Sequence, residues 1–302
     1  MSAEPHISPP QLEVSKPKAH PKSSSLWLDA LSRLVKSKTS FIGLCLILLL
    51  ILTAIFAPVI ATYDPTEVQL LDRYQAPSSE HWLGTDELGR DIFSRIVYGS
   101  RISIQVGVIA VGISAIVGIL LGGIAGYFGR WVDQIIMRII DILMAFPSIL
   151  LAIALVAVLG PSLTNAMIAV GIVGVPQFAR IVRSTVLSVK ETEYIEAARA
   201  IGAKSNRILF QHVLPNCTAP IIVQATLGIG TAILDAAGLS FLGLGAQPPA
   251  PEWGAMLSDG RAALQTSPWV ITFPGIAIFL VVLAFNLFGD GLRDALDPRL
   301  KQ

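Results

Sequence analysis

FIGLCLILLLILTAIFAPVIA, residues 41–61, contains no charged residue. A bilayer core about 30 Å thick is crossed by a helix of about 20 mainly apolar residues, so this stretch predicts a membrane-spanning helix. The whole chain shares this character: 53% of its 302 residues are hydrophobic and 14% are charged, whereas a soluble domain is about 25% charged. The sequence therefore predicts an all-α membrane protein.

Five further stretches approach the same length and apolarity, which gives six predicted transmembrane helices. They lie at about 104–127, 139–159, 163–187, 219–244 and 269–288. The stretch 163–187 is the least uniform because Arg180 and Arg183 lie in its second half. Long arginine stems near a helix end can reach the membrane interface, so these charges are compatible with a span.

The first 40 residues differ from the rest of the chain. Residues 1–25 are rich in Pro, Ser and Lys, which predicts a disordered cytoplasmic tail. In residues 26–40 apolar side chains recur at helical spacing. This pattern predicts a short amphipathic helix on the membrane surface, capped by Ser25.

The basic residues predict the orientation of the helices. If both termini are cytoplasmic, the cytoplasmic segments hold most of the 22 lysines and arginines. The outer segments then hold only Arg73, Arg90, Arg95, Arg101 and Arg261. This bias satisfies the positive-inside rule, and it places two sizeable segments, about 62–103 and 246–268, outside the cell.

The sequence lacks the motifs of an enzyme. It has no G-x-x-x-x-G-K-[S/T] phosphate loop, its four histidines are scattered, and Cys45 and Cys217 fall in or near apolar runs. We therefore expect no catalytic residue, metal or cofactor in this chain. The net charge of +1 argues against a nucleic-acid partner.

Two carboxylates lie in or beside the apolar runs, at Asp141 and Asp235. Ionisable groups inside a membrane are costly, so both are candidates for a translocation pathway. For Asp141 the alternative is an intrahelical ion pair with Arg138, three residues earlier. Asp235 lies deeper, where it either bonds to a neighbouring helix or lines a water-filled path.

A polar insert, EYIEAARAIGAKSNRILFQHVLPN (residues 193–216), separates the fourth and fifth predicted helices. Ser188 and Glu191 have the spacing of a capping box, which predicts a helix that begins near Val189. Gly202 predicts a break after this helix. Ser205 predicts the cap of a second short helix.

The first helix of the insert is expected to have an apolar face. The residues that would line this face are Tyr194, Ile195, Ala198 and Ile201. Two amphipathic helices on the cytoplasmic side predict a docking element for another protein. A simple solvated loop is the alternative, but it would not need two such helices.

The insert resembles the EAA loop of ABC-type importer permeases, whose pattern is E-A-A, three residues, G, nine residues and I-x-L-P. The matching residues are Glu196, Ala197, Ala198, Gly202, Leu214 and Pro215. His212 stands where the pattern has isoleucine. In that family the loop, about residues 188–216 here, is the coupling helix that contacts the ATPase, so the resemblance implies an ATPase-coupling role for the matching residues.

Three longer stretches are similar to the C-type permease subunit of dipeptide and oligopeptide importers. They are GTDELGRDIFSR (84–95), AGLSFLGLGAQPPAPEWGAML (237–257) and FNLFGDGLRDALDPRLK (285–301). The resemblance implies a type I ABC importer permease fold over residues 41–302, forming half of a translocation pore. The similarity is closest to the peptide importers, so short peptides are the expected substrates. Nickel and glutathione importers share this subunit type, so glutathione or nickel complexes are the alternatives.

The resemblance also implies the rest of a complex in the inner membrane of a bacterial or archaeal cell. The expected partners are a homologous B-type permease, two ATP-binding subunits that hold ATP and Mg, an extracytoplasmic solute-binding protein, and membrane lipid. We expect contacts with the binding protein in the outer loops, at Asp86, Arg90, Asp91 and Trp253. Two alternatives from other classes are a non-transporting membrane scaffold and an ion-driven transporter that uses Asp141 and Asp235. The second leaves the cytoplasmic helix pair without a purpose.

Overall fold

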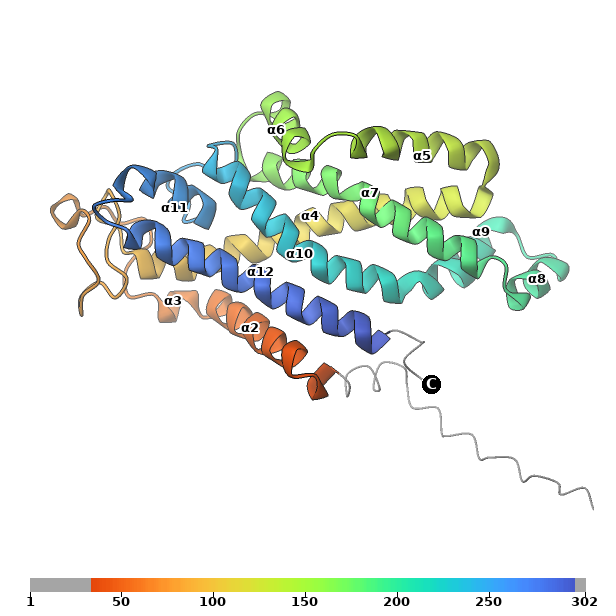
Figure 1. Cartoon of the computed structure of the whole chain (residues 1–302), viewed down its shortest axis with the longest axis horizontal. Helices are drawn as coiled ribbons and strands as arrows, with labels where there is room; N and C mark the ends of the chain where they lie inside the picture. Colours follow the sequence, from red (N-terminus) through yellow and green to blue (C-terminus); the bar gives the residue numbers. More distant parts are fainter. Residues whose placement is uncertain (1–33, 297–302) are drawn as a thin grey trace, which may run out of the picture.

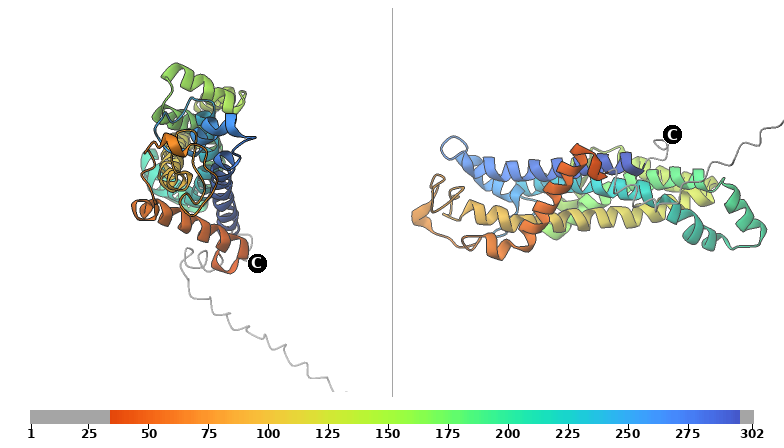
Figure 2. Two further views of the ribbon diagram at one scale, coloured as in Figure 1. Left: turned by 90° about the vertical axis from the view of Figure 1, so that its left-hand side faces the viewer. Right: turned by 90° about the horizontal axis from the view of Figure 1, so that it is seen from below.

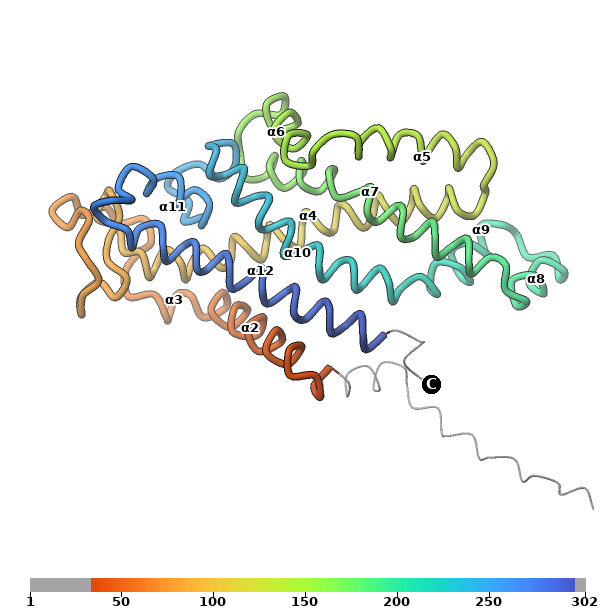
Figure 3. The backbone as a smooth tube through the Cα atoms, in the orientation of Figure 1, coloured from red at the N-terminus to blue at the C-terminus, as the bar shows by residue number. Residues whose placement is uncertain are grey.

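The long helices lie side by side along the long axis of an elongated molecule (Figures 1 and 2). The computed structural model describes residues 34–296. Loops and α11 (Trp253–Gly260) gather at one end of the bundle, and the short helices α8 (Glu193–Ala200) and α9 (Ser205–Arg207) lie at the other (Figure 1). Figure 3 shows the same path as a tube.

Within the described residues, five helical stretches are long and apolar enough to cross a membrane. They are α2 (Lys38–Ile55), α4 (Ile92–Phe128), α7 (Leu163–Val189), the stretch Ser205–Phe241 that ends in α10 (Thr218–Phe241), and α12 (Trp269–Leu296). A sixth crossing exists if α5 (Arg130–Met144) and α6 (Ser148–Leu159) count as one span, although they meet at 93°. The prediction of an all-α membrane protein is confirmed.

The span predicted at 139–159 is not one continuous helix, because the chain bends sharply between α5 and α6. Proline has no backbone N–H and its ring clashes with the preceding turn of a helix. Pro147 accordingly stands just before α6, as its N-cap. The N–H of Ala145 closes α5 by donating to the carbonyl oxygens of Asp141 and Ile142.

Glycines let α4 and α7 pack closely along most of their length. Gly118, Gly122 and Gly126 recur every fourth residue of α4 and are buried. A Cβ at Gly122 would overlap the backbone of Ala179 in α7. Small residues at this spacing allow two helix backbones to approach each other within a membrane, so this glycine seam, residues 118, 122 and 126, fixes α4 against α7.

α10 packs against α4, α7 and α12, and α2 packs along α12 (Figure 1). α2 and α12 also approach closely at a glycine, because a Cβ at Gly43 would lie 2.7 Å from the backbone N of Phe288. The expected packing role of Cys217 agrees with its complete burial, whereas Cys45 is exposed on α2. α10 is therefore the central helix between the α4–α7 pair and the α2–α12 pair.

The two helices of the insert begin at other residues than predicted. Ser188 lies in the last turn of α7, which ends at Val189, and its hydroxyl donates to the carbonyl oxygen of Ser184. α8 begins at Glu193, and Ser205 is the first residue of α9 rather than its cap. Both predicted caps are therefore wrong.

The predicted tail 1–25, its cap Ser25 and most of the predicted surface helix 26–40 lie outside the described residues. Leu34, at the edge of this region, is buried with Val223 and Leu292. α2 begins at Lys38, a few residues before the predicted start at Phe41.

Candidate functional site

α8 lies on a small hydrophobic core at the end of α7. Ile195 is completely buried there. The other buried members of this core are Val182, Val186, Ile208, Leu209, Val213 and Cys217. The expected outward-facing role of Ile195 is wrong, because this side chain attaches α8 to α7.

The opposite side of α8 is exposed, and we call Tyr194, Ala197 and Ile201 the α8 face. These residues follow one another at i, i+3 and i+7, so they share one side of the helix. Ile201 is 86% exposed and Tyr194 is 46% exposed. Glu196 is exposed beside them, and Ala198 is half-buried. These exposed side chains make the α8 face a candidate interaction surface.

Gly202 ends α8 in a conformation that requires glycine. Its φ is +81°, a region that other L-residues rarely adopt. No atom lies within 4 Å of a Cβ built at this position, so backbone conformation rather than space demands the glycine. The predicted break at Gly202 is confirmed.

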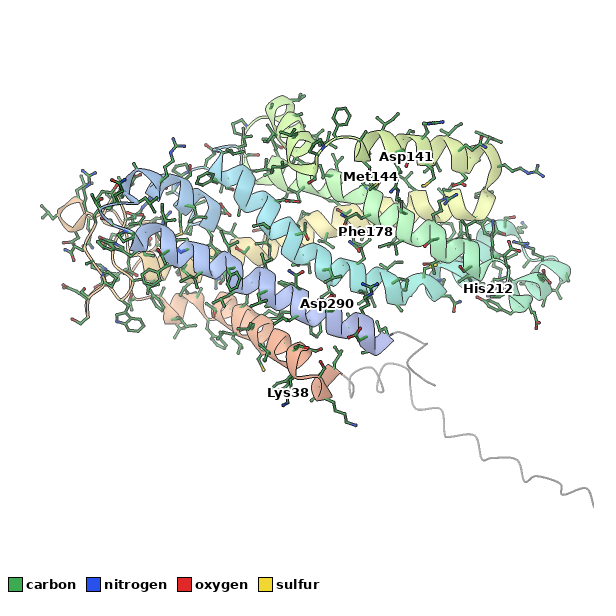
Figure 4. The ribbon with its side chains drawn as sticks, in the orientation of Figure 1. Lys38, Asp141, Met144, Phe178, His212 and Asp290 are labelled. Atoms are coloured by element: carbon green, nitrogen blue, oxygen red, sulfur yellow. The ribbon has the colours of Figure 1, made fainter. Side chains whose placement is uncertain are left out.

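Leu214, Pro215 and His212 do not belong to the α8 face. Leu214 is half-buried and packs against the core beneath α8. Pro215 is exposed at the start of a short turn of helix, Leu214–Cys217. The carbonyl oxygen of His212 accepts from the amide of Asn216 at 2.6 Å, and Figure 4 shows His212 near this end of the bundle. Of the three, only Leu214 belongs to the core on which α8 lies.

A second candidate site is a polar stripe on α10, formed by Gln224, Thr231 and Asp235. Their spacing, i, i+7 and i+11, places them on one side of the helix. The amide of Gln224 donates to the side-chain oxygen of Gln177 in α7 at 2.9 Å. Together they border a cavity of about 100 Å³ between α7 and α10. Asp235 is half-buried and has no hydrogen bond or ion pair with any described residue.

Asp141 lies on α5, away from this stripe (Figure 4). Its carboxylate accepts from the guanidinium of Arg180 in α7 at 2.6 Å, so the predicted pair with Arg138 is wrong. The guanidinium of Arg183 donates to Asp133 in the same way, at 2.6 Å between Nη2 and Oδ2. These two ion pairs attach α5 to α7. Asp141 therefore holds two helices together, and it does not lie near Asp235.

At the other end of the bundle, the 62–91 segment is built around buried charges. The Asp86 carboxylate accepts from Arg90 Nε at 2.6 Å and from the backbone N–H groups of Leu88 and Arg90. Arg95 lies 3.6 Å from the same carboxylate and donates to the carbonyl oxygen of Pro65. Arg90 also approaches Asp259 of α11 at 3.5 Å.

Asp91 is the N-cap of α4. Its carboxylate accepts from the backbone N–H and the hydroxyl of Ser94 at 2.8 and 2.7 Å. It also contacts His81 Nδ1 at 2.9 Å. A carboxylate at this position satisfies otherwise unpaired N–H groups and favours the helix dipole. Asp91 therefore fixes the start of α4 to the 62–91 segment.

The four residues expected to contact a binding protein are all buried. Asp86, Arg90, Asp91 and Trp253 are between 2% and 4% exposed, and the indole N–H of Trp253 donates to the carbonyl oxygen of Ile96. This burial corrects the expectation of direct contact, because these side chains hold the segment together. The exposed apolar residues of the segment, which the sequence analysis missed, are Val68, Leu70, Leu71 and Trp82.

Burial raises the pKa of Glu252 above the usual 4.5, although its carboxylate caps α11 by accepting from the N–H of Ala255. The folded state then holds this proton more tightly than the unfolded state, so stability falls as pH rises from about 4.5 through the raised pKa.

Glu252→Gln keeps an acceptor for the cap and removes the titration. We expect the unfolding temperature of Glu252→Gln to rise relative to that of the wild type as pH rises. The exposed control Glu80→Gln should show no such trend. A constant difference across pH would contradict this.

Among the described residues, no group of three or more His, Cys, Asp or Glu is placed to hold a metal ion. The described residues instead form an exposed apolar face at the α8 end, a small cavity bordered by the polar stripe within the bundle, and a segment with buried charges at the opposite end.

Comparison with known proteins identifies this arrangement. Residues 118–302 match the family described as binding-protein-dependent transport system inner membrane component, and residues 25–77 match the N-terminal TM domain of oligopeptide transport permease C. The chain is 57% identical over 301 residues to the dipeptide transport system permease protein DppC of Alkalihalophilus pseudofirmus, covering 100% of this chain and 97% of that relative.

A second relative is the glutathione transport system permease protein GsiD of Pectobacterium atrosepticum, which is 50% identical and covers 91% of this chain and 92% of the relative. The fold is similar to that of the MetNI methionine ABC transporter in an inward-facing conformation, with a TM-score of 0.55 and 20% identity over 67% of this chain and 96% of that chain. The expected family is therefore confirmed. The chain belongs to the inner-membrane permeases of binding-protein-dependent ABC importers.

Proposed function

We propose that this chain forms one half of the pore of an ATP-driven importer of dipeptides and other short peptides. This proposal rests on the 57% identity, along the whole chain, to a permease named for dipeptide transport. Glutathione is the second candidate substrate, because relatives named for glutathione transport are 50–51% identical. Both substrates are small peptides, so the same pore chemistry serves either one.

In this proposal the α8 end faces the cytoplasm and the 62–91 segment faces outward. The bias of the basic residues supports this orientation. A homologous B-type permease completes the pore, and two ATP-binding subunits hold ATP and Mg, so this chain contributes no catalytic residue. The solute-binding protein contacts the outer end through the exposed residues of the 62–91 segment, with Leu71 the most exposed at 100%.

The α8 face is the proposed seat of an ATP-binding subunit. Glu196, Ala197 and Ala198 lie on or beside it, and Gly202 sets its end. The buried Ile195 connects α8 to α7, so force applied to α8 reaches a membrane helix without an intervening flexible loop. Leu214 and Pro215 contribute by shaping the support beneath α8.

Ile201→Asp tests the proposed function. The substitution places a charge at the centre of an apolar contact, and an unpaired charge in an interface is costly. We expect the variant to insert into the membrane normally, to co-purify poorly with the ATP-binding subunits and to lose most uptake of a labelled dipeptide. Glu196→Lys should have the same effect in weaker form.

Leu71→Asp is the matched control, because it changes an equally exposed apolar residue at the opposite end of the molecule. It should leave co-purification of the ATP-binding subunits unchanged. Normal uptake by Ile201→Asp at normal expression would refute the coupling role. Saturable uptake of labelled glutathione that unlabelled dipeptides do not suppress would make glutathione the substrate.

A further inference from the structure

We infer that Asp235 contacts the cationic amino group of the transported substrate at the closed end of a groove between α7 and α10. The inference rests on the proposed transport function and deepens it. It assigns a ligand chemistry, an ammonium group, to a carboxylate that the fold leaves without a partner.

The face that carries Asp235 is unsuited to lipid. Gln177 and Thr231 are exposed on the surface of this chain, and Gln224 and Asp235 are partly exposed beside them. All four lie in helices that qualify as membrane spans. Polar groups turned toward hydrocarbon are costly, and intramembrane carboxylates face protein or water instead. This face therefore borders a water-filled path or the partner permease.

Two cavities lie along this face. The smaller, about 100 Å³, lies beside Asp235, and the larger, about 560 Å³, opens toward the α8 end between α7, α10 and α12. Gln224 lines both of them, and Asn216 and Arg293 line only the larger. Because Gln224 lines both, the two cavities are neighbours, and we treat them together as one groove that leads from the α8 end to Asp235.

Beyond Asp235 the groove is closed by apolar packing. Ala236 and Leu239, one and four residues further along α10, are buried. They pack in a cluster with Ala152 and Val156 of α6 and with residues of α4 and α7. Asp235 is thus the last polar side chain of the α10 stripe before this apolar cluster. A substrate must pass Asp235 when the cluster opens.

The charges in the structure leave Asp235 free for a ligand. The two arginines of α7, Arg180 and Arg183, are already paired with Asp141 and Asp133, and no described residue bonds to Asp235. A carboxylate in a membrane is stabilised by a cation that comes close to it. Dipeptides and glutathione both carry an ammonium group that can play this part.

The size of the site limits the contact to one end of the substrate. A cavity of about 100 Å³ accommodates an ammonium group with its first atoms but not a whole dipeptide. A single contact also suits a pore, because conduction requires sites that bind weakly enough to release. The amides of Gln177 and Gln224 then provide neutral partners for the following peptide group.

The test uses the complete importer, with its binding protein and ATP-binding subunits, in proteoliposomes. Asp235→Glu, Asp235→Asn and Asp235→Lys are compared for dipeptide uptake and for ATP hydrolysis stimulated by the loaded binding protein. Asp290→Asn is the control, because Asp290 lies on α12 outside both cavities (Figure 4). Losing one charge-assisted contact is expected to lower maximal uptake about tenfold in Asp235→Asn.

We expect uptake to be highest in Asp235→Glu, lower in Asp235→Asn and lowest in Asp235→Lys. Stimulated ATP hydrolysis and complex assembly should stay near wild type in all three variants. The half-saturating concentration of loaded binding protein should not move, because that protein contacts the other end of the pore. Wild-type uptake by Asp235→Asn would overturn the inference. Loss of assembly in Asp235→Asn would overturn it too, since Asp235 would then bond to the partner permease. Absence of peptide uptake by the wild-type complex would refute the proposed function instead.

Discussion

Gly122→Val is expected to prevent the chain from folding into a stable bundle. Even a Cβ at this position overlaps the backbone of Ala179, which cannot move aside as a flexible side chain can. A branched side chain would force α4 and α7 apart along the glycine seam, where a Cβ at Gly118 would overlap a side chain of α7 and one at Gly126 would lie 2.9 Å from the nearest atom of α7. Overpacking of a core costs about 1–3 kcal/mol and in some cases more, and we expect the upper end here because the overlap is with backbone atoms. Size-exclusion chromatography and thermal unfolding of the detergent-solubilised protein measure the effect.

Gly112→Val is the control for this substitution. Gly112 lies in the same helix, and no atom is within 4 Å of a Cβ built there. Any loss of helix propensity is therefore shared by the two variants, whereas the clash belongs to Gly122 alone. If both variants unfold at the same temperature, the close approach of α4 and α7 does not hold the bundle together.

Asp86→Ala is expected to open the 62–91 segment. The substitution removes the carboxylate that faces both Arg90 and Arg95, which are 3% and 1% exposed, and leaves two buried guanidinium groups with Asp259 as the remaining carboxylate nearby. Removing one partner of a buried ion pair costs about 3–5 kcal/mol. Trypsin cannot reach these arginines in the folded segment, so new cleavage after Arg90 or Arg95 reports the opening.

Glu80→Ala is the control for Asp86→Ala, since it removes an exposed carboxylate from the same segment. It should keep the trypsin resistance of the wild type. An intact segment in Asp86→Ala would show that hydrogen bonds such as that from Arg95 to Pro65 suffice without the ion pair.

The membrane spans and the break at Gly202 were predictable because their signals are local. The apolar composition of a run such as 41–61 by itself predicts a membrane span, and a glycine that follows a helix predicts a positive φ. The bend between α5 and α6 also had a local signal in Pro147, but the apolar pattern continues on both sides of it and suggested one helix.

The pairing of charges was not predictable, because it depends on helix packing. Asp141 is three residues from Arg138 in sequence, yet it pairs with Arg180 of another helix. Asp86 and Arg90 have the composition of a solvated loop, but α11 and the start of α4 cover them. In α8, the apolar pattern shows that a face exists without showing that Ile195 turns inward and Ile201 outward.

The length of α4 has a mechanical consequence. Its 37 residues extend for about 55 Å, and Asp91 fastens one end of this rod to the 62–91 segment. The rod is fused sideways to α7, whose far end carries α8. The pair is thus a lever arm: a tilt of about 5° imposed at α8 sweeps the opposite end through about 5 Å for a rod of this length. A small rotation at one surface becomes a displacement wider than an atom at the other.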